Sequence, residues 1–437
     1  MRNKHDYRAG RCFRILAGVL FLVLISGCGG TASRGHRTFL DTDLHPGSSS
    51  LQQQDMPERI ILNLTEEPWS SQAVTWRTIS GALTPQAQIA CLAESSDLLE
   101  TTAQTFRADT QPADATGARK AFHHSVVFTS LSPGTLYAYR VGDGQNWSEW
   151  NQFRTAQKIP SPFTFIYFGD PQEQVLSMCS RIFRTAYKTA PYAAFWLFVG
   201  DLVDNGDRDE EWADLFDAFG WIPRMTPVIL LPGNHEYPDK RYIQGQDYKL
   251  FPLWRPHFTL PENGPAGLEE TVYFIDYQGV RFVMLNGNEQ LEKQARWLDG
   301  ILKENPNGWT IVSIHQPIYS IAQRRKGRES VSLIDLFVPV FDRYSVDLVL
   351  QGHDHAYSRT AGLRNTGRAA ADEQGTVYII SVCGPKSYRT SDRYNDIMEK
   401  SGTDRQLFQV ISIDEGRLEY ECYDARGALF DSFVLEK

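Results

Sequence analysis

Five apolar segments of the chain each stop at a short polar loop that carries residues able to bind a metal. The five loops are Gly169-Asp170-Pro171-Gln172, Gly200-Asp201-Leu202-Val203-Asp204, Gly233-Asn234-His235-Glu236, His315-Gln316-Pro317 and Gly352-His353-Asp354-His355. Each loop alone is a weak signal, because Gly-Asp is a common turn pair and Asn often caps helices. In open α/β sheets, however, ligands bind at the carboxyl ends of the strands, where loops distant in sequence meet. The series therefore predicts one polar site in preference to five unrelated loop caps.

The segments between these loops alternate between strand and helix patterns. Apolar runs of strand length occupy residues 163–168, 195–199, 228–231, 281–285, 310–314, 346–350 and 377–382, and helical patterns occupy residues 174–189, 209–219, 289–303 and 332–344. This alternation is typical of a sheet with helices on its faces. Hairpin-like segments between residues 407 and 434 complete the predicted sheets. We therefore predict an α/β domain over residues 158–437.

Residues 59–155 follow a different pattern, with short alternating segments, Gly, Pro, Ser and Asn turns, and no long helical period. Strands at this spacing predict a β-sandwich of about 100 residues. The stretch over residues 131–141, closed by residues 153–155, resembles a fibronectin type III module. We therefore predict an all-β domain over residues 57–157, in which His123 and His124 lie at a strand edge and have no ligand role.

The first 28 residues have the composition of a secretion signal. Five basic residues precede an apolar run over residues 15–25, which is shorter than the roughly 20 residues needed to span a bilayer. Ile25-Ser26-Gly27-Cys28 resembles a bacterial lipobox, which implies cleavage after residue 27 and a lipid on Cys28. An ordinary signal peptide and a signal anchor are the alternatives. Residues 28–56 are rich in Gly, Ser, Thr and Gln, and they are expected to form a flexible tether.

The charge of the chain narrows the choice of partners. Loss of the signal peptide, residues 1–27, removes five basic residues and one acidic residue and changes the formal net charge from −9 to −13. Affinity for nucleic acid comes largely from clustered Lys and Arg, so nucleic-acid binding is not expected. We expect a small polar substrate and, through the lipid on Cys28, a membrane. The protein would then be extracytoplasmic and anchored to the cell envelope, in the periplasm or at the cell surface.

Four cysteines remain once Cys12 is assigned to the signal and Cys28 to the lipid, and no two of them have CxxC spacing. They are Cys91, Cys179, Cys383 and Cys422. This spacing excludes a zinc ribbon. Buried thiols are the favoured interpretation, and a disulfide is permitted outside the cytoplasm.

The order of residues in the five polar loops resembles that of the calcineurin-like metallophosphoesterases. Gly-Asn-His-Glu, Gly-His-Asp-His-Ala-Tyr and the preceding β module are similar to the purple acid phosphatase branch of that superfamily. The resemblance covers residues 57–437. It implies a four-layer α/β/β/α sandwich that follows an N-terminal all-β sandwich domain.

The resemblance also implies two divalent or trivalent metal ions, drawn from Fe, Mn and Zn. One ion would be held by Asp170, Asp201 and His355, and the other by Asp201, Asn234, His315 and His353. Asp201 would bridge the two. Carboxylate, amide oxygen and imidazole are ligands that suit such cations.

Two further residues of the Gly-Asn-His-Glu loop have expected roles. By the resemblance, His235 faces the leaving-group oxygen and donates a proton or a hydrogen bond to it. The alternative for His235 is a supporting contact to the ligands. Glu236 is expected to orient the site.

Two residues depart from the family pattern. Gln172 stands where many metallophosphoesterases have a histidine, and Asp204 stands where purple acid phosphatases have a tyrosine. The first site therefore lacks both the usual imidazole and the tyrosinate that colours those enzymes, and no purple ferric centre is expected. The Gln172 oxygen, Asp204 or a water molecule is left to complete this site, although we favour Asp204 as a cap of the next helix.

The resemblance implies that the chain hydrolyses phosphate esters by a metal-bound hydroxide, as an acid phosphatase-like phosphomonoesterase. A phosphodiesterase acting on nucleotides or lipid headgroups, and a non-catalytic surface binding protein, are the alternatives. Several residues could face the substrate or simply be solvated. They are the basic stretch over residues 324–328, His257, Lys386, Tyr388 and Arg389.

Overall fold

A computed structural model describes residues 56–79, 84–92, 100–113, 121–240, 242–243, 245, 248–323, 328–370 and 373–437. All described residues belong to one compact unit, Gln53–Lys437. The predicted signal peptide, Cys28, the tether up to residue 55 and the basic residues 324–327 lie outside the described residues. Within the described ranges, no helix is both long enough and apolar enough to cross a membrane.

The elements follow the order that the sequence pattern predicts. The strands are β1 (Glu58–Asn63), β2 (Gln72–Thr78), β3 (Gln86–Cys91), β4 (Gln104–Arg107), β5 (Asp109–Ala113), β6 (Ala121–Phe128), β7 (Leu136–Gly142), β8 (Asn151–Arg154), β9 (Phe163–Phe168), β10 (Trp196–Phe198), β11 (Val228–Leu230), β12 (Tyr273–Tyr277), β13 (Val280–Leu285), β14 (Trp309–Ile314), β15 (Leu348–Gln351), β16 (Tyr357–Thr360), β17 (Leu363–Arg364), β18 (Gly367–Arg368), β19 (Val377–Ile380), β20 (Met398–Gly402), β21 (Leu407–Asp414), β22 (Arg417–Asp424) and β23 (Leu429–Glu436). The helical elements are η1 (Val175–Cys179), α2 (Ser180–Thr189), α3 (Asp209–Phe219), η2 (Ile222–Arg224), α4 (Trp254–His257), α5 (Leu291–Lys303) and α6 (Arg328–Arg343).

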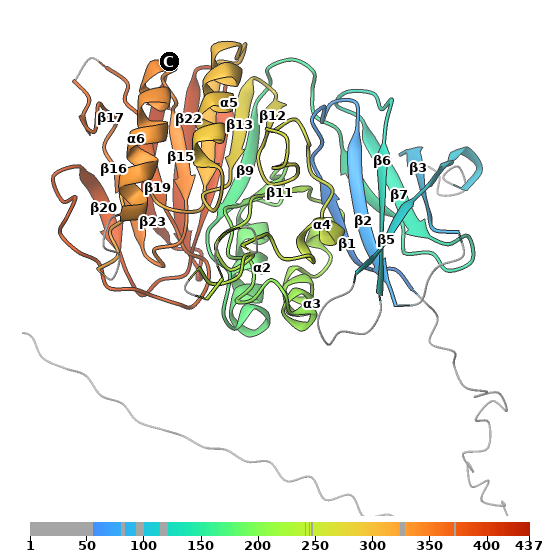
Figure 1. Ribbon diagram of the computed structural model, residues 1–437. Coiled ribbons are helices and arrows are strands. Elements are labelled where there is room, and N and C mark those ends of the chain that lie inside the picture. The colour runs from blue at the N-terminus through green and yellow to red at the C-terminus, as the bar shows by residue number, and fades with distance from the viewer. Residues whose placement is uncertain are drawn as a thin grey trace, which may run out of the picture. The chain divides into compact units, whose positions relative to one another are not determined.

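Two large sheets carry the fold (Figure 1). The first is ten-stranded, with the order β23-β22-β21-β9-β10-β11-β1-β2-β6-β5, and the second is seven-stranded, with the order β12-β13-β14-β15-β19-β16-β20. Strands β9, β10 and β11 run parallel in the first sheet, and β13, β14, β15 and β19 run parallel in the second. Each sheet therefore has an edge at which the carboxyl ends of several strands collect.

Side-chain alternation along the strands builds the four layers. On β13, Phe282 packs into the core between the sheets, whereas its neighbour Val283 packs into the core beneath α5 and α6. On β9, Phe165 contacts Phe282, whereas Phe168 contacts Phe183 of α2. A strand with both faces buried is expected to be mainly apolar, as these runs are apart from Thr164 on β9 and Arg281 on β13. The predicted α/β fold with an N-terminal all-β domain is confirmed.

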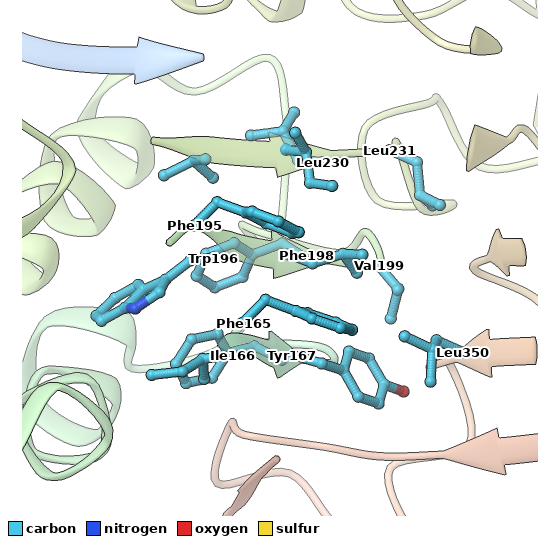
Figure 2. Close-up of a cluster of buried hydrophobic side chains, with 14 of the residues drawn as sticks. Phe165, Ile166, Tyr167, Phe195, Trp196, Phe198, Val199, Leu230, Leu231 and Leu350 are labelled. Atoms are coloured by element: carbon cyan, nitrogen blue, oxygen red, sulfur yellow. The ribbon is translucent and has the colours of Figure 1, made fainter. Parts of the chain in front are cut away.

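Aromatic side chains fill much of the space between the two sheets (Figure 2). The rings of Phe165 and Phe195 stack with centroids 5.2 Å apart, and the ring of Phe282 meets the ring of Phe165 edge-on, also at 5.2 Å. Tyr167 adds a polar link, because its hydroxyl donates to the carbonyl of Gln351 and accepts from the Gln351 N–H at 3.1 Å. This link fixes the end of β15 relative to β9.

The N-terminal strands β1, β2, β6 and β5 extend the ten-stranded sheet. Strand β1 pairs in parallel with β11, and the Asn63 side chain donates to the Val228 carbonyl at 2.9 Å. Strands β4, β3, β7 and β8 form a smaller, four-stranded sheet. A separate apolar core lies between this sheet and the strands β1, β2 and β6. The likeness of this domain to fibronectin type III stays a prediction. All four described cysteines are free, and all except the exposed Cys91 are buried.

The prediction that His123 and His124 lie at a strand edge is wrong. Both belong to β6, which is flanked by β2 and β5, and their exposed fractions are 2% and 1%. The sequence did not reveal this burial, because β5 reads as a polar, exposed segment.

A buried polar cluster joins the N-terminal strands to α3 and α4. Arg59 contacts Asp209 at 2.5 Å and the Nε2 atom of His257 at 2.9 Å, and Arg77 contacts Asp209 at 3.1 Å. The His257 ring stacks on Trp212. His257 is therefore a core residue of this junction, not a wall for the substrate.

Two histidines of the cluster resist protonation. Burial, and after it the charges of Arg59 and Arg77, lower the pKa of His123 to about 3. Burial and the neighbouring His123 hold the pKa of His257 well below its ordinary value. Both rings are therefore neutral in the folded chain at every pH near neutrality.

This cluster predicts a loss of stability in mild acid. Below the ordinary histidine pKa of 6.5, the unfolded chain takes up a proton at residue 123 that the folded chain refuses until about pH 3. The free energy of unfolding should therefore fall by up to about 1.4 kcal/mol per pH unit for this histidine alone. Urea titrations at pH 7, 6 and 5 should show a shallower pH dependence for His123→Phe than for the wild type. Equal slopes would contradict the assignment.

Candidate metal centre

The five polar loops meet where the two sheets come together. Asp170, Asp201 and the Asn234-His235 pair follow β9, β10 and β11 of the ten-stranded sheet. His315 and the two histidines of the last loop follow β14 and β15 of the seven-stranded sheet. The carboxylate of Asp170 accepts the backbone N–H of His353 at 2.8 and 2.7 Å. Loops from separate sheets are thus tied directly to each other.

Four of the predicted ligands have left-handed backbone conformations. Their φ angles are 45° for Asp170, 49° for Asp201, 71° for His353 and 45° for His355. Such conformations are uncommon outside glycine, and they gather at functional sites because surrounding contacts hold them in place. Here they turn each side chain inward immediately after its strand ends.

Two glycines allow the loops to approach closely. A Cβ atom on Gly233 would lie 2.1 Å from Oδ1 of Asp201, and one on Gly352 would lie 2.2 Å from Oδ2 of Asp170. Both distances are far below contact distance. The Gly-Asn-His-Glu and Gly-His-Asp-His loops therefore need glycine at their first position for the carboxylates to fit.

The structure brings the predicted acids and imidazoles into two groups that share Asp201. The first group is Asp170, Asp201 and His355, and the second is Asp201, His315 and His353. Within each group the donor atoms lie within 4.8 Å of one another. His315 Nε2 is 3.0 Å from Asp201 Oδ2, and His355 Nε2 is 3.9 Å from Asp170 Oδ1. The resemblance assigns these acids and imidazoles to the same two sets and adds Asn234 to the second; that they bind metal stays a prediction.

Two features of the second group fit a cation. The Nδ1–H of His315 donates to the Val199 carbonyl at 2.7 Å, which leaves Nε2 directed at the group, as in metal-bound histidines. The Oδ1 atom of Asn234 is buried and has no hydrogen-bond partner among the described residues. A buried acceptor without a donor calls for an explanation, and a cation supplies one.

Glu236 holds the backbone of the site. Its carboxylate accepts the N–H groups of Asp201 at 3.0 Å, Leu202 at 2.8 Å and Gly233 at 2.7 Å. Burial, followed by the charge of Asp201, raises the pKa of Glu236 to about 7. The expected orienting role of Glu236 thus corresponds to a clamp on the two loops that carry Asp201 and Asn234.

Opposite charges within the centre reinforce one another. For the protein side chains alone, burial opposes ionisation of Asp201, but the imidazoles, led by His315, hold its pKa well below the ordinary value. Burial likewise opposes protonation of His315, but Asp201 raises its pKa to about 9. A buried carboxylate therefore needs positive charge around it, whether from imidazolium or from metal.

His235 lies beside the centre, at a cleft of about 590 Å³ that Asn234, His353, Tyr237 and Tyr248 also line. Its Nδ1–H donates to the Asp204 carbonyl at 2.5 Å, and its Nε2 is 4.0 Å from Asp201 Oδ2. Burial lowers the pKa of His235, but Asp201 and the Asp204 carbonyl outweigh it and raise the pKa above the ordinary value.

Asp204 does not cap the next helix, contrary to the favoured interpretation. Helix α3 begins at Asp209, follows Arg208 and has no side-chain cap. The Asp204 carboxylate is 48% exposed and lies 3.5 Å from His235 Nδ1. It therefore lies at the half-exposed rim of the cleft, beside His235.

Other candidates are placed as follows. Tyr388 packs edge-on against the His355 ring at 4.8 Å, and Lys386 pairs with Glu173 at 3.0 Å. The sequence reasoning missed the role of Asp354, whose buried carboxylate accepts from Ser320, Ile321 and Ala322. The position of Asp354 between His353 and His355 is the sequence feature that could have indicated this role.

Comparison with known proteins agrees with the geometry. The family described as the purple acid phosphatase N-terminal domain matches residues 57–155, and the calcineurin-like phosphoesterase family matches residues 163–357. Acid phosphatase type 7 of Homo sapiens is 28% identical over 427 residues, covering 83% of this chain and 89% of that protein. An uncharacterised protein of Mycobacterium tuberculosis is 28% identical over 274 residues, covering 54% of this chain and 50% of that protein. The chain thus matches about half the length of that relative.

The fold has a solved counterpart. Purple acid phosphatase PPD1 from yellow lupin seeds superimposes with a TM-score of 0.71 at 18% identity, covering 87% of this chain and 74% of that one. At this identity the likeness shows the fold. The two family matches show that residues 57–155 are similar to a purple acid phosphatase N-terminal domain and that residues 163–357 are similar to a calcineurin-like phosphoesterase domain.

Proposed function

We propose that the chain hydrolyses small phosphate monoesters at a centre of two metal ions. The observation that carries the proposal is the pair of buried ligand groups that share Asp201 and border the cleft at His235. Its relatives include acid phosphatase type 7 of Homo sapiens, whose name states the same class of reaction. The metals, drawn from Fe, Mn and Zn, are part of the proposal.

The ligand groups define what each side chain would do. Asp170, Asp201 and His355 would hold one ion, and Asp201, Asn234, His315 and His353 the other. Two such ions supply positive charge for the phosphate oxygens and a nucleophilic water of lowered pKa. The Asp170 contact to His353 and the Glu236 clamp keep the two groups in register, so that little reorganisation accompanies binding.

In this proposal, His235 would serve the leaving group. Because Nδ1–H is committed to the Asp204 carbonyl, Nε2 is the ring atom left to hold a proton on the side of the ligands. That proton would pass to the oxygen of the departing alcohol. Tyr237 and Tyr248, whose rings stack with centroids 5.2 Å apart, offer an apolar wall for the organic part of the ester.

The role of His235 predicts a dependence on the leaving group. His235→Ala should retain a near-normal metal content while its kcat falls about 10²- to 10⁴-fold for an alkyl phosphate. An aryl phosphate with a strongly acidic phenol needs less proton donation, so the decrease should be clearly smaller for it. Steady-state kinetics with both esters, and elemental analysis of the same preparations, check the prediction. Equal decreases for the two esters would argue against proton donation.

Metal dependence separates an enzyme from a binding protein. The purified soluble part should contain about two transition-metal ions per chain, lose turnover on dialysis against a chelator, and regain it when metal is returned. Parallel assays with a chromogenic monoester and diester should show the monoester hydrolysed faster. A faster diester reaction would favour a phosphodiesterase, and an inactive metal-free chain would favour a surface binding protein.

We further propose that the protein is a lipoprotein of the cell envelope. The support is the Ile25-Ser26-Gly27-Cys28 sequence after a basic and apolar segment. In a bacterial host, the full chain should incorporate labelled palmitate and sediment with membranes, because acyl chains drive membrane binding. Cys28→Ser should abolish labelling. Labelling of that variant would overturn the assignment of the lipid to Cys28.

A further inference from the structure

Gln172 reaches into the first ligand group. It lies four residues after the end of β9, and its exposed fraction is 0%. Its Nε2 atom lies 2.9 Å from Asp201 Oδ2 and 3.0 Å from His355 Nε2, both of them predicted ligand atoms. Its Oε1 atom is buried and has no hydrogen-bond partner within the described part of the chain. The amide therefore touches two ligands while one of its polar atoms lacks a partner.

These distances are hydrogen-bond distances of the Gln172 Nε2 atom, and they equal the separation of neighbouring ligands on one ion. Two ligands at right angles, each about 2.1 Å from a cation, are separated by about 3.0 Å. The tip of the Gln172 amide lies at this separation from both Asp201 and His355. Rotation of the amide by 180° exchanges its oxygen and nitrogen with almost no change of shape. Only the oxygen has lone pairs for a cation, so the rotated amide is the ligating form.

The competing residue does not occupy this place. The Asp204 carboxylate is half-exposed and faces Nδ1 of His235, whereas the first group is buried. Of the two side chains left to complete this group, Gln172 alone contacts its donor atoms in the described residues.

We propose that the Gln172 amide oxygen is a ligand of the site formed by Asp170, Asp201 and His355, and that it shifts the preference of this site towards Mn²⁺. The inference rests on the proposed metal centre. With Gln172, the first site has three oxygen donors and one nitrogen donor, whereas the second has two of each. Oxygen donors suit Mn²⁺, and imidazole suits Zn²⁺. The ratio of Mn²⁺ affinity to Zn²⁺ affinity is therefore higher at the first site than at the second.

Three variants test the inference by metal binding. Gln172→Leu keeps a side chain of similar size without the oxygen, and Gln172→His supplies the imidazole that many relatives have. Gln316→Leu is the matched control, because Gln316 is also buried, also follows a ligand-bearing strand and has an unpartnered Oε1 among the described residues. Calorimetric titration of the metal-free proteins with Mn²⁺ and Zn²⁺, with elemental analysis, gives stoichiometry and affinity.

The expected results are specific to one site. Gln172→Leu should weaken one of the two Mn²⁺ binding steps about 10- to 100-fold and leave the other unchanged. Gln172→His should raise the Zn²⁺-to-Mn²⁺ affinity ratio of that same step about tenfold or more. Gln316→Leu should leave both steps unchanged. Urea midpoints identify any variant that binds weakly because it is unfolded, and Gln172→His then carries the test.

The inference is overturned if Gln172→Leu binds both ions as the wild type does, or if Gln316→Leu shows the same loss. It is also overturned if Gln172→His leaves the affinity ratio unchanged. These failures differ from failure of the proposed function, in which the wild type itself would bind fewer than two ions or would not hydrolyse an ester. If the wild type binds two ions and Gln172→Leu binds them equally well, Gln172 is not a metal ligand, but the proposed hydrolase function stands.

Discussion

The hydrogen bonds between the Asp170 carboxylate and the backbone of His353 are the contacts on which the site depends most. Asp170 ends a strand of one sheet and His353 follows a strand of the other, so this pair joins the two halves of the centre. The Tyr167 hydroxyl links the same two strands slightly earlier along the chain, where it binds the Gln351 backbone. Both contacts are buried, where an unpaired carboxylate or hydroxyl is costly, and that cost fixes the relative position of the sheets. Packing of the aromatic layer holds the two sheets together, while these polar contacts fix how the strands of one sheet are aligned with those of the other.

A second constraint is that several acids must share a small, buried volume. Asp170, Asp201 and Glu236 are all nearly or fully buried. The buried Glu236 carboxylate accepts hydrogen bonds from three backbone N–H groups. These bonds link the loop of Asp201 to the loop of Asn234. Asp201 instead depends on imidazoles and on whatever cation the centre holds, which makes it the residue most sensitive to metal. Each acid thus accepts backbone N–H groups, and Asp170 and Asp201 in addition face the imidazoles of the two ligand groups.

The sequence predicts the site better than it predicts the surroundings. Strands such as β9 are mainly apolar because both faces are buried, and the glycine and acid that follow mark the strand end, so their position could be inferred without tertiary information. The burial of His123 could not, since it depends on pairing with β5, whose sequence looks like an exposed loop. The pairing of β1 with β11 joins segments 165 residues apart at Asn63 and Val228, and no local pattern records it. Asp204 was misread for a related reason: its contact to His235 uses the backbone carbonyl, which every residue has.

That carbonyl makes the role proposed for His235 compatible with Asp204 at the position where the resemblance predicts a tyrosine. His235 is held by the main chain of residue 204, so the side chain at that position is not needed to orient the ring. By the resemblance, the tyrosine expected at position 204 and the histidine expected at position 172 would both serve the first site, so their absence leaves the residues proposed for the second site intact. A hydrolytic centre needs charge and a positioned water but no change of oxidation state. The chain can therefore forgo the chromophoric ligand and still meet the physical requirements of phosphate-ester hydrolysis.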